Sequence, residues 1–436
     1  MPPRFHSLIA TQFVSALADN ALLVVAIALL QRSGQPAWWT PLLKFFFIVS
    51  YVVLAPLVGA LADAQPKPQL MAWMNGVKLG GALALAFGAH PLLAFGVIGF
   101  GAAAYAPAKY GLITEWVGAA RLVAANAWLE VSVVGAILLG TAAGGFLVSD
   151  GFTTRPLALA LDAWAARHGF GAAASLAPAF AAVLALYGLS TLINLRLRGG
   201  AAAAPRRGWS AIHPLALWRE FDVANRALWA DTQGGRLSLA ITTLFWGAAA
   251  VLQFAVLRWA TDRLGLTLAG AAYLQAAVAL GLIAGAWFAG RRVALQHAPR
   301  VLLAGPLLGL LVALGPWLDA VAVAAVLLAV IGAVGGVLMV PMNALLQHRG
   351  CQLLSPGRSI AVQGFNENVS VLAMLAAYAA TVWLEVPIAP LMTGFGLAVA
   401  AAMAWLAWRL RAGGRRAPNR ATAPVQVLKG RSNSGL

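Results

Sequence analysis

The sequence predicts an all-helical membrane protein, with twelve transmembrane helices in two pseudo-symmetric six-helix bundles and both termini in the cytoplasm. Three observations support this fold class. Of the 436 residues, 61% are hydrophobic and only 10% are charged; apolar segments long enough to cross a bilayer follow one another; and patterns in the first half recur in the second. Soluble proteins carry about 25% charged residues, so the composition excludes an ordinary water-soluble enzyme. The single cysteine, Cys351, excludes an internal disulfide and a cysteine-based metal cluster.

The spans follow from the length of the apolar segments. A helix needs roughly 20 mostly apolar residues to cross the bilayer core, because lipid offers no hydrogen-bond partner to the backbone. The first segment has no small-residue cleavage site, so we expect a retained span and not a removed signal peptide. The expected spans are residues 7–31, 41–62, 70–88, 91–113, 123–149, 172–195, 236–261, 268–290, 300–317, 319–347, 359–383 and 386–410.

The basic residues give the orientation. With both termini in the cytoplasm, 22 of the 30 Lys and Arg residues fall on the cytoplasmic side, 4 on the opposite side and 4 at or within spans. Cytoplasmic loops of membrane proteins carry an excess of Lys and Arg, so this distribution supports an even number of spans. The net charge of +17 therefore sets orientation and contacts anionic lipid headgroups, and we expect no nucleic-acid partner.

The loops give the domain boundaries. Residues 1–195 are expected to form the N-terminal bundle and residues 236–410 the C-terminal bundle. The connection between them, 196–235, is a cytoplasmic linker in which apolar residues at helical spacing predict a short helix on the membrane surface; a plain linker is the alternative. The tail, 411–436, is basic and rich in Gly, Pro and Ser, and is expected to be disordered.

The two halves share short patterns in corresponding spans. The fourth span matches the tenth and the fifth matches the eleventh, at nearly the same offset, which is the order expected of a duplicated six-span unit. The matched positions are Gly101 with Gly335, Pro107 with Pro341, Lys109 with Asn343, Asn126 with Gln363, and Glu130 with Glu367.

A loop motif after the second span supports the same architecture. Gly59-Ala-Leu-Ala-Asp63, with Lys67 four residues later, resembles the Gly-x-Leu-x-Asp loop of the major facilitator superfamily. The resemblance implies the major facilitator fold, with a substrate site between the halves near the bilayer midplane. It also implies that Asp63 caps or pairs with a neighbouring helix end and helps to hold one gate closed; a solvated loop acid is the alternative. The second half keeps Gly285 but has Ala289 where the acid would be.

Charged side chains inside the spans are the main candidates for a transport site. A charge at the bilayer centre costs about 2.5–3.5 kcal/mol on insertion scales, so each needs a partner or a water-filled cavity. No acid and base of the set lie three or four residues apart on one helix, so their pairs must form between helices. Such pairs can break in one transporter state and re-form in another. The acids are Asp19, Glu130 and Glu367, and the bases are Lys44, Lys78, Lys109 and Arg258.

Polar neighbours extend this set of candidates. For the central charges the alternative is purely structural pairing. For Lys44 and Arg258, near span ends, extension of the side chain to the interface is the favoured interpretation. The polar neighbours are Gln12, Asn20, Asn75, Tyr105, Asn343, Gln363 and Asn366.

The sequence gives little support to enzyme chemistry. The six histidines are scattered over ends and loops, and none has a second histidine at a metal-ligand spacing. No histidine has an aspartate five residues later, as a membrane acyltransferase would need, and the chain contains no Gly-x-x-x-x-Gly-Lys phosphate loop. We therefore expect a protein that is not an enzyme and that has neither a metal site nor an ATP-driven motor.

Longer blocks resemble the bacterial lysophospholipid transporters, a family of this superfamily. They are residues 12–23, 101–111, 340–350 and 363–368, and the resemblance extends over roughly 7–410. It implies transport of lysophosphatidylethanolamine and lysophosphatidylglycerol from the outer to the inner leaflet of the bacterial cytoplasmic membrane. There an acyltransferase restores the missing chain, which is a step of phospholipid remodelling. This chain lacks such a domain, so a separate acyltransferase/acyl-carrier-protein synthetase is the expected partner.

The substrate chemistry distributes roles among the candidates. Lys78 or Lys109 could bind the phosphate, and Asp19 or Glu367 the ammonium group. The resemblance further implies a basic residue near Gln253 in the seventh span, facing Asp19, whereas the sequence has Arg258 five residues later. The residues that could line the path of the acyl chain are Phe245, Trp246 and Phe254.

Two other functions remain open at this stage. One is a major facilitator exporter of another amphipathic solute or drug, and the other is a non-transporting membrane scaffold that docks an acyltransferase through 196–235. We expect no cofactor. The energy source stays open, because Asp19 or Glu367 could carry a proton or bind sodium, and reacylation could equally drive a downhill flow.

Overall fold

The computed structural model describes residues 1–36, 39–169, 171–197 and 214–414. Helices make up nearly all of these residues, and this part of the chain contains no strand. The predicted all-helical fold is therefore confirmed. Part of the expected linker, 198–213, and most of the expected tail, 415–436, lie outside the described residues.

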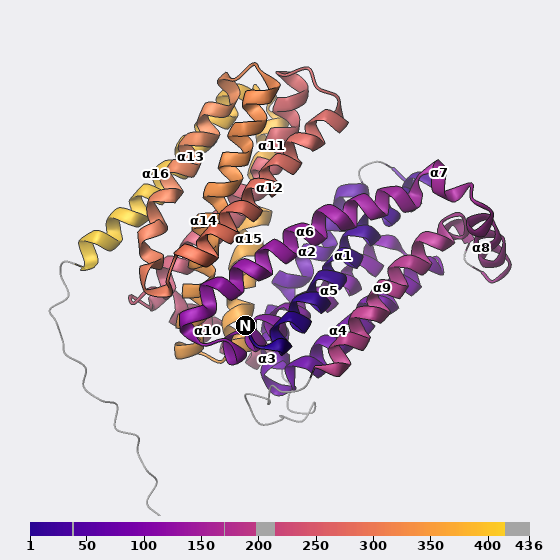
Figure 1. The fold of residues 1–436 in the computed structure, drawn as a ribbon, viewed down its shortest axis with the longest axis horizontal. Coiled ribbons are helices and arrows are strands. Elements are labelled where there is room, and N and C mark those ends of the chain that lie inside the picture. Colours follow the sequence, from indigo (N-terminus) through magenta and orange to yellow (C-terminus); the bar gives the residue numbers. More distant parts are fainter. Residues whose placement is uncertain (37–38, 170, 198–213, 415–436) are drawn as a thin grey trace, which may run out of the picture.

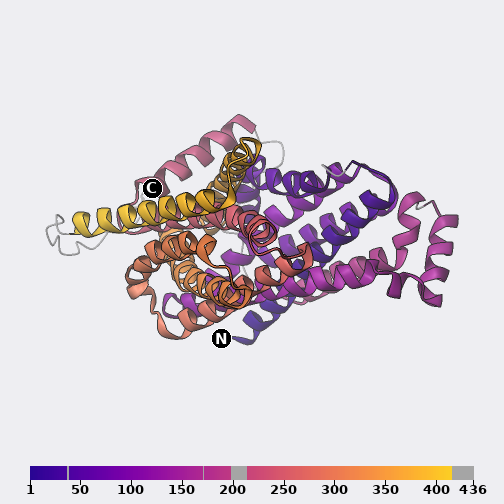
Figure 2. The same ribbon diagram turned by 90° about the horizontal axis from the view of Figure 1, so that it is seen from above.

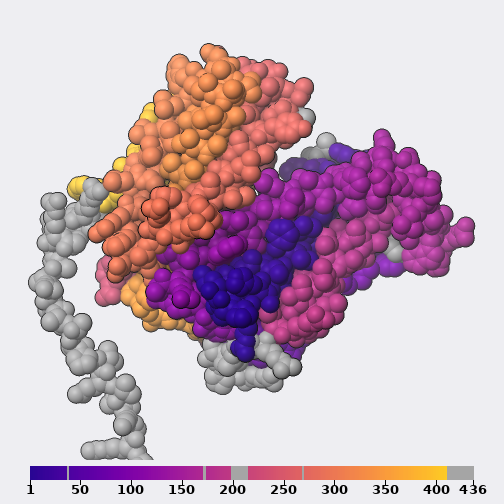
Figure 3. All heavy atoms as spheres, viewed as in Figure 1, coloured from indigo at the N-terminus to yellow at the C-terminus, as the bar shows by residue number. Residues whose placement is uncertain are grey.

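The helices form two lobes, which Figure 1 shows in contact at the end where the N-terminus lies and apart at the opposite end. The space-filling view shows the resulting cleft between the lobes (Figure 3). The first lobe contains α1 (Pro3–Arg32), α2 (Trp39–Val53), α3 (Ala55–Ala64), α4 (Lys67–Ala86), α5 (Pro91–Trp116), α6 (Leu122–Val148), α7 (Asp150–Thr153), α8 (Pro156–Arg167) and α9 (Ala177–Arg196), with the 3-10 helices η1 (Ala119–Arg121) and η2 (Gly171–Leu176).

The second lobe follows α10 (Pro214–Ala230). This helix lies at the end where the two lobes are in contact, the closed end of the molecule. Seen from above, α16 and the α7–α8 region lie at opposite extremes of the molecule (Figure 2). The second lobe contains α11 (Gly235–Asp262), α12 (Leu268–Arg292), η4 (Leu295–Leu303), α13 (Ala304–Leu314), η5 (Gly315–Trp317), α14 (Val321–Leu353), α15 (Pro356–Trp383) and α16 (Ile388–Gly414).

Nine helices of the described chain are long and apolar enough to cross a membrane, and the bent pair α2–α3 would make a tenth. The sequence predicts one uninterrupted span over 41–62, but the two helices meet at 63°. Pro56 stands in the first turn of α3; it has no N–H to donate to the Val52 carbonyl four residues earlier and its ring clashes with that carbonyl, so α2 and α3 cannot form one straight helix. Two further long helices, α4 and α15, carry the polar side chains expected at the site.

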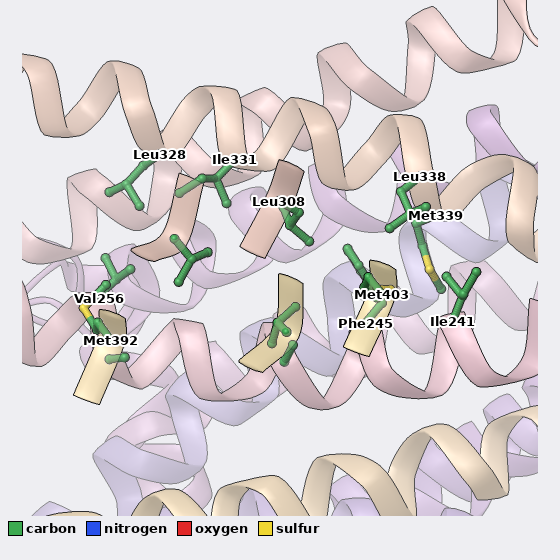
Figure 4. Packing of buried hydrophobic residues seen from close by; sticks show 14 of the residues in the cluster. Ile241, Phe245, Val256, Leu308, Leu328, Ile331, Leu338, Met339, Met392 and Met403 are labelled. Atoms are coloured by element: carbon green, nitrogen blue, oxygen red, sulfur yellow. The ribbon is translucent and has the colours of Figure 1, made fainter. Parts of the chain in front are cut away.

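Glycines let α12 and α14 pack closely in the second lobe. A Cβ on Gly285 of α12 would overlap the backbone oxygen of Ala333 in α14, and one on Gly332 of α14 would overlap that of Val278 in α12. Without a hydrophobic driving force in lipid, such close backbone approach is a main source of helix association. Around this contact, apolar side chains of α11, α13, α14 and α16 interdigitate to form the core (Figure 4).

Gly332→Ala is expected to destabilise the protein by about 1–3 kcal/mol, because the new methyl group forces α12 and α14 apart. Gly80→Ala in α4 is the matched control: no atom lies within 4 Å of the added methyl, and replacing a helical glycine gains about 0.5–1 kcal/mol. The measurement is the melting temperature of the purified protein in detergent. A Gly332→Ala protein that melts with or above the wild type contradicts the packing argument.

Candidate functional site

An interhelical ion pair lies in the first lobe, between Asp19 of α1 and Lys78 of α4. The Lys78 ammonium donates to the two carboxylate oxygens at 2.8 and 3.0 Å. The Tyr187 hydroxyl of α9 donates to Asp19 Oδ1 at 2.7 Å, and the ring of Tyr105 in α5 lies 5.2 Å from Lys78 Nζ. The Lys78 side chain is 2% exposed and that of Asp19 is 18% exposed, so the carboxylate is the accessible member of the pair.

A chain of hydrogen bonds links this pair to buried polar groups of α1, α4 and α9. Lys78 donates to Ser15 Oγ at 2.8 Å, Ser15 donates to Asn75 Oδ1 at 2.8 Å, and the Asn75 amide donates to Ser190 Oγ at 2.7 Å. Ser190 in turn donates to the Thr11 carbonyl at 3.0 Å. All of these groups are buried, so the network fixes the orientation of Lys78. Asn75 is predicted from the sequence but the hydroxyl residues are not, since serine and threonine in apolar helices give no distinctive signal.

A second pair of opposite charges lies between α5 and α6. Lys109 and Glu130 are 7% and 6% exposed and are close enough to interact electrostatically. No direct ion pair joins them within the described part of the chain, and the Lys109 ammonium instead lies 4.5 Å from the centre of the Tyr110 ring. Buried charges that attract without contact are suited to binding a polar ligand group between them.

The second lobe contributes an amide–carboxylate cluster. Gln363 of α15 donates to Asn343 Oδ1 of α14 at 2.9 Å and to Glu367 Oε1 at 2.8 Å. Glu367 is close enough to Glu130 of the first lobe for the two carboxylates to repel each other. The structure therefore brings the charges of both lobes toward one region between the halves.

Tyrosines lie near these charges, and of them only Tyr105 is predicted from the sequence. Tyr51 of α2 interacts with the charge of Asp19, and Tyr110 lies within electrostatic reach of both Glu130 and Glu367. Four of the six tyrosines in the chain gather at this site: Tyr51, Tyr105, Tyr110 and Tyr187. The scarcity of tyrosine in so apolar a chain was the available signal, because a phenol hydroxyl inside a span needs a polar neighbour.

The other expected site residues contact neighbouring groups of their own lobe. Asn20 donates to the Ala16 carbonyl of its own helix at 2.8 Å. Arg258 pairs with Asp262 at 3.2 Å, near the end of α11, and so does not pair with Asp19. Gln253 lines an apolar cavity of the second lobe, and its backbone oxygen accepts from the Gln275 side chain. Gln12 is buried in α1 and Trp246 packs edge-on against the Phe245 ring.

Asn366 contacts α10 and not the charged cluster. Its amide donates to Asn225 Oδ1 at 2.9 Å, and its oxygen accepts from Trp229 Nε1 at 3.1 Å. Phe221 of α10 meets the ring of Phe365 edge-on at 5.2 Å. Further along the helix Arg358 forms an ion pair with Glu220. These contacts hold α10 against the first half of α15.

Asp231, between α10 and α11, holds the closed end of α14. Its carboxylate accepts from Arg349 at 2.9 and 3.2 Å and from the Gly235 backbone amide at 2.7 Å. Burial raises the pKa of Asp231, but these hydrogen bonds, with one from the Gln233 amide, outweigh that effect and hold the pKa below its usual range. The carboxylate therefore stays ionised and both caps α11 and pairs with Arg349.

The Asp63 motif joins the two lobes. Asp63 of α3, 3% exposed, accepts from the Gly357 backbone amide at 2.9 Å and from the Ser355 hydroxyl, at the start of α15. This arrangement is a helix cap supplied from the other lobe. At Gly59, an added Cβ would lie 3.0 Å from that of Ala361, so glycine allows α3 and α15 to approach.

Two other polar contacts lie at this closed end. Lys67 forms an ion pair with Glu115 of α5, which stays within the first lobe. Asn126 of α6 and Gln347 of α14 exchange two amide hydrogen bonds, at 2.9 and 2.8 Å, between the lobes. Both amides are buried, so separation of the lobes here must break fully desolvated hydrogen bonds.

An apolar cavity of about 240 Å³ adjoins the interface between the lobes. Most of its wall comes from α11, α12 and α14, and α6 contributes Val134, Ile137 and Leu138. Phe245, one of the residues expected on the path of an acyl chain, lines it, whereas Trp246 and Phe254 do not. The cavity can accept a hydrocarbon group.

Comparison with known proteins places the chain in a family. No protein-family model matches it. It is 38% identical over 408 residues to the lysophospholipid transporter LplT of Escherichia coli strain K12, an alignment that covers 93% of this chain and 96% of the relative. LplT of Shigella dysenteriae serotype 1 matches to the same extent. The chain belongs to the lysophospholipid transporter family. The predicted family resemblance is thus confirmed.

Solved structures confirm the major facilitator fold. The transporter FucP in its outward conformation superposes with a TM-score of 0.69 at 15% identity, covering 93% of this chain and 97% of that protein. A bacterial homologue of the iron transporter ferroportin, in an outward-facing state, gives 0.65 at 16% identity, covering 94% and 100%. Both likenesses concern the fold alone.

Proposed function

We propose that this protein is a transporter that moves lysophosphatidylethanolamine and lysophosphatidylglycerol from the outer to the inner leaflet of the bacterial inner membrane. The observation that carries the proposal is the 38% identity with LplT over nearly the whole of both chains. The ten candidate spans, together with α4 and α15, would give twelve membrane crossings. In this topology both termini and the closed end of the molecule face the cytoplasm.

The groups at the site match the parts of a lysophospholipid. Lys109, attracted by Glu130 but not in contact with it, is available for the phosphate. Asp19, the accessible member of its pair, and Glu367 are available for the ammonium of an ethanolamine headgroup. The apolar cavity between α11, α12 and α14 receives the single acyl chain. The headgroup can thus bind to the charged groups while the acyl chain occupies the cavity.

Alternating access follows from the contacts at the closed end. The cleft between the lobes faces the outer leaflet, and the Asp63 cap and the Asn126–Gln347 pair keep the cytoplasmic side shut. To release substrate into the inner leaflet, these contacts must open while the outer ends of the lobes close.

The transporter needs no bound cofactor in this scheme, and a separate acyltransferase/acyl-carrier-protein synthetase consumes its product in phospholipid remodelling. Asp19 or Glu367 carries the coupling proton or sodium ion if the transport is coupled. Comparing headgroup flipping in vesicles with and without imposed sodium and proton gradients tests this point, because downhill flow driven by reacylation needs neither gradient.

Purified protein in vesicles is expected to move lysophospholipid without any partner protein. Failure to do so would favour the scaffold function, and transport of unrelated amphipathic solutes alone would favour an exporter.

Ala248→Phe is expected to lower uptake of a long-chain lysophospholipid several-fold, since Ala248 lines the cavity and the phenyl ring would fill it. Ala250→Phe, two residues along the same helix and outside the cavity wall, is the matched control and should transport like the wild type. Uptake by the two variants is measured with long-chain and short-chain substrates. Equal uptake of the long chain by both variants would contradict the assignment of the cavity.

A further inference from the structure

Lys44 is a cation that the transport scheme above leaves unused. It lies in α2, five residues after the helix begins at Trp39, and its side chain is exposed. No acid of the described chain pairs with it. The sequence favoured extension of this side chain to the interface, but its position on α2 points to a more specific role.

The face of α2 that carries Lys44 also carries Tyr51. Residues seven apart on a helix lie within about 20° of each other around the axis and about 10.5 Å apart along it. Tyr51 lies within electrostatic reach of Asp19 and Tyr110 at the site between the lobes. The neighbouring side of α2, with Leu43 and Ser50, is buried, and Ser50 donates to the Gly96 carbonyl of α5 at 2.9 Å. Lys44 therefore lies about two turns outward of Tyr51 on the stripe of α2 that leads to the site.

The charged groups between the lobes leave a net negative charge that a further cation would offset. The buried region between the lobes holds three acids and two bases when all are ionised: Asp19, Glu130 and Glu367 against Lys78 and Lys109. A lipid phosphate adds another negative charge, which this region alone would repel. Arg258 is already paired with Asp262, whereas Lys44, near the start of α2, has no acid partner among the described residues.

We propose that Lys44 is the outer phosphate-binding residue of the substrate path. It binds the phosphate of a lysophospholipid that enters the cleft from the outer leaflet, and the headgroup then moves about two helical turns along α2, past Tyr51, to Lys109. This inference rests on the proposed function, and it adds a specificity-determining residue for phosphate-bearing lipids.

The test compares Lys44→Met and Lys44→Arg with the wild type. Because the ammonium group would form a charge-assisted hydrogen bond with the phosphate, Lys44→Met is expected to raise the KM for lysophosphatidylglycerol about tenfold, with Vmax within about twofold. Lys44→Arg should stay near the wild type. Arg263→Gln is the control: it removes another cation expected on the outer side, one whose side chain is 51% exposed, and should change neither constant.

Equilibrium binding of lysophosphatidylglycerol to the detergent-purified protein separates this inference from the proposed function. Weaker binding by Lys44→Met without any flipping by the wild type would reject the transport function but keep the phosphate site. Normal flipping with an unchanged KM and unchanged binding in Lys44→Met would overturn the inference alone. A loss of Vmax at constant KM would also overturn it, as would a wild type that binds no lysophospholipid. Monoacylglycerol, which lacks phosphate, should bind equally to both proteins, and effective competition by inorganic phosphate would show a site for the free ion and not for the lipid.

Discussion

Asp19→Asn is expected to reduce lysophospholipid uptake at least about tenfold, the largest loss of any single substitution at the site. The substitution removes the carboxylate charge but keeps nearly the same volume. It leaves the Lys78 ammonium, 2% exposed, without its counter-ion, and the loss of one partner of a buried pair costs about 3–5 kcal/mol. Because the Asp19 carboxylate is the accessible member of the pair, the change also removes a group available to the substrate headgroup.

A double-mutant cycle separates pairing from substrate contact. Uptake and melting temperature are measured for Asp19→Asn, Lys78→Met and the double variant. If the pair is mainly structural, the double variant should be more stable than either single variant, because neither charge is then left alone. Uptake that stays low in the stable double variant would show a direct role for the pair in transport.

The exposed pair Asp222–Arg226 provides the matched control for this cycle. Its side chains are 51% and 80% exposed, and surface pairs contribute about 0–1 kcal/mol. Asp222→Asn should therefore leave uptake and melting unchanged. Asp19→Asn with uptake like that of Asp222→Asn would contradict the role of the buried charge.

The sequence predicts which residues form this site better than it predicts which of them pair. Asp19 and Lys78 stand out, because ionisable residues inside apolar spans are rare and costly. Their pairing with each other is not evident from the sequence, since three acids and four bases allow many combinations. Which residues pair depends on how far each helix is shifted and rotated against its neighbours. Arg258 illustrates the limit: it pairs with Asp262, one turn along its own helix, an acid that the set of intramembrane charges did not include.

The fold, too, is predictable from the sequence only in part. Hydropathy places nearly all of the spans, because span length follows from bilayer thickness. It does not show the 63° bend between α2 and α3, which depends on a proline within an apolar run. The Asp63 motif predicts a cap on some helix end, but its partner Gly357 lies in the other half of the chain. Only the packing of the two lobes selects that partner.

Opening of the closed end is expected when Asp63 is replaced by alanine. The Gly357 amide and the Ser355 hydroxyl then lose their acceptor at a buried position, which costs about 1–3 kcal/mol in the state where this end is shut. If the amide is hydrated when the lobes separate, the equilibrium shifts toward the open state by about tenfold or more. Gly357→Ala should act in the same direction, since its added Cβ would lie 2.6 Å from Asp63 Oδ1.

The single cysteine of the chain reports this opening without any engineered label site. Cys351, on α14 of the second lobe, lies close enough to Thr114, Lys67 and Asp63 of the first lobe to interact with them electrostatically. Its rate of reaction with a membrane-impermeant maleimide in detergent should rise about tenfold in Asp63→Ala, in proportion to the population of the open state. Asp150→Ala, which changes an acid at the start of α7, is the control and should label like the wild type. An unchanged rate in a folded Asp63→Ala protein would show that the cap does not hold the lobes together, and the Asn126–Gln347 pair and α10 would then be the contacts that keep this end shut.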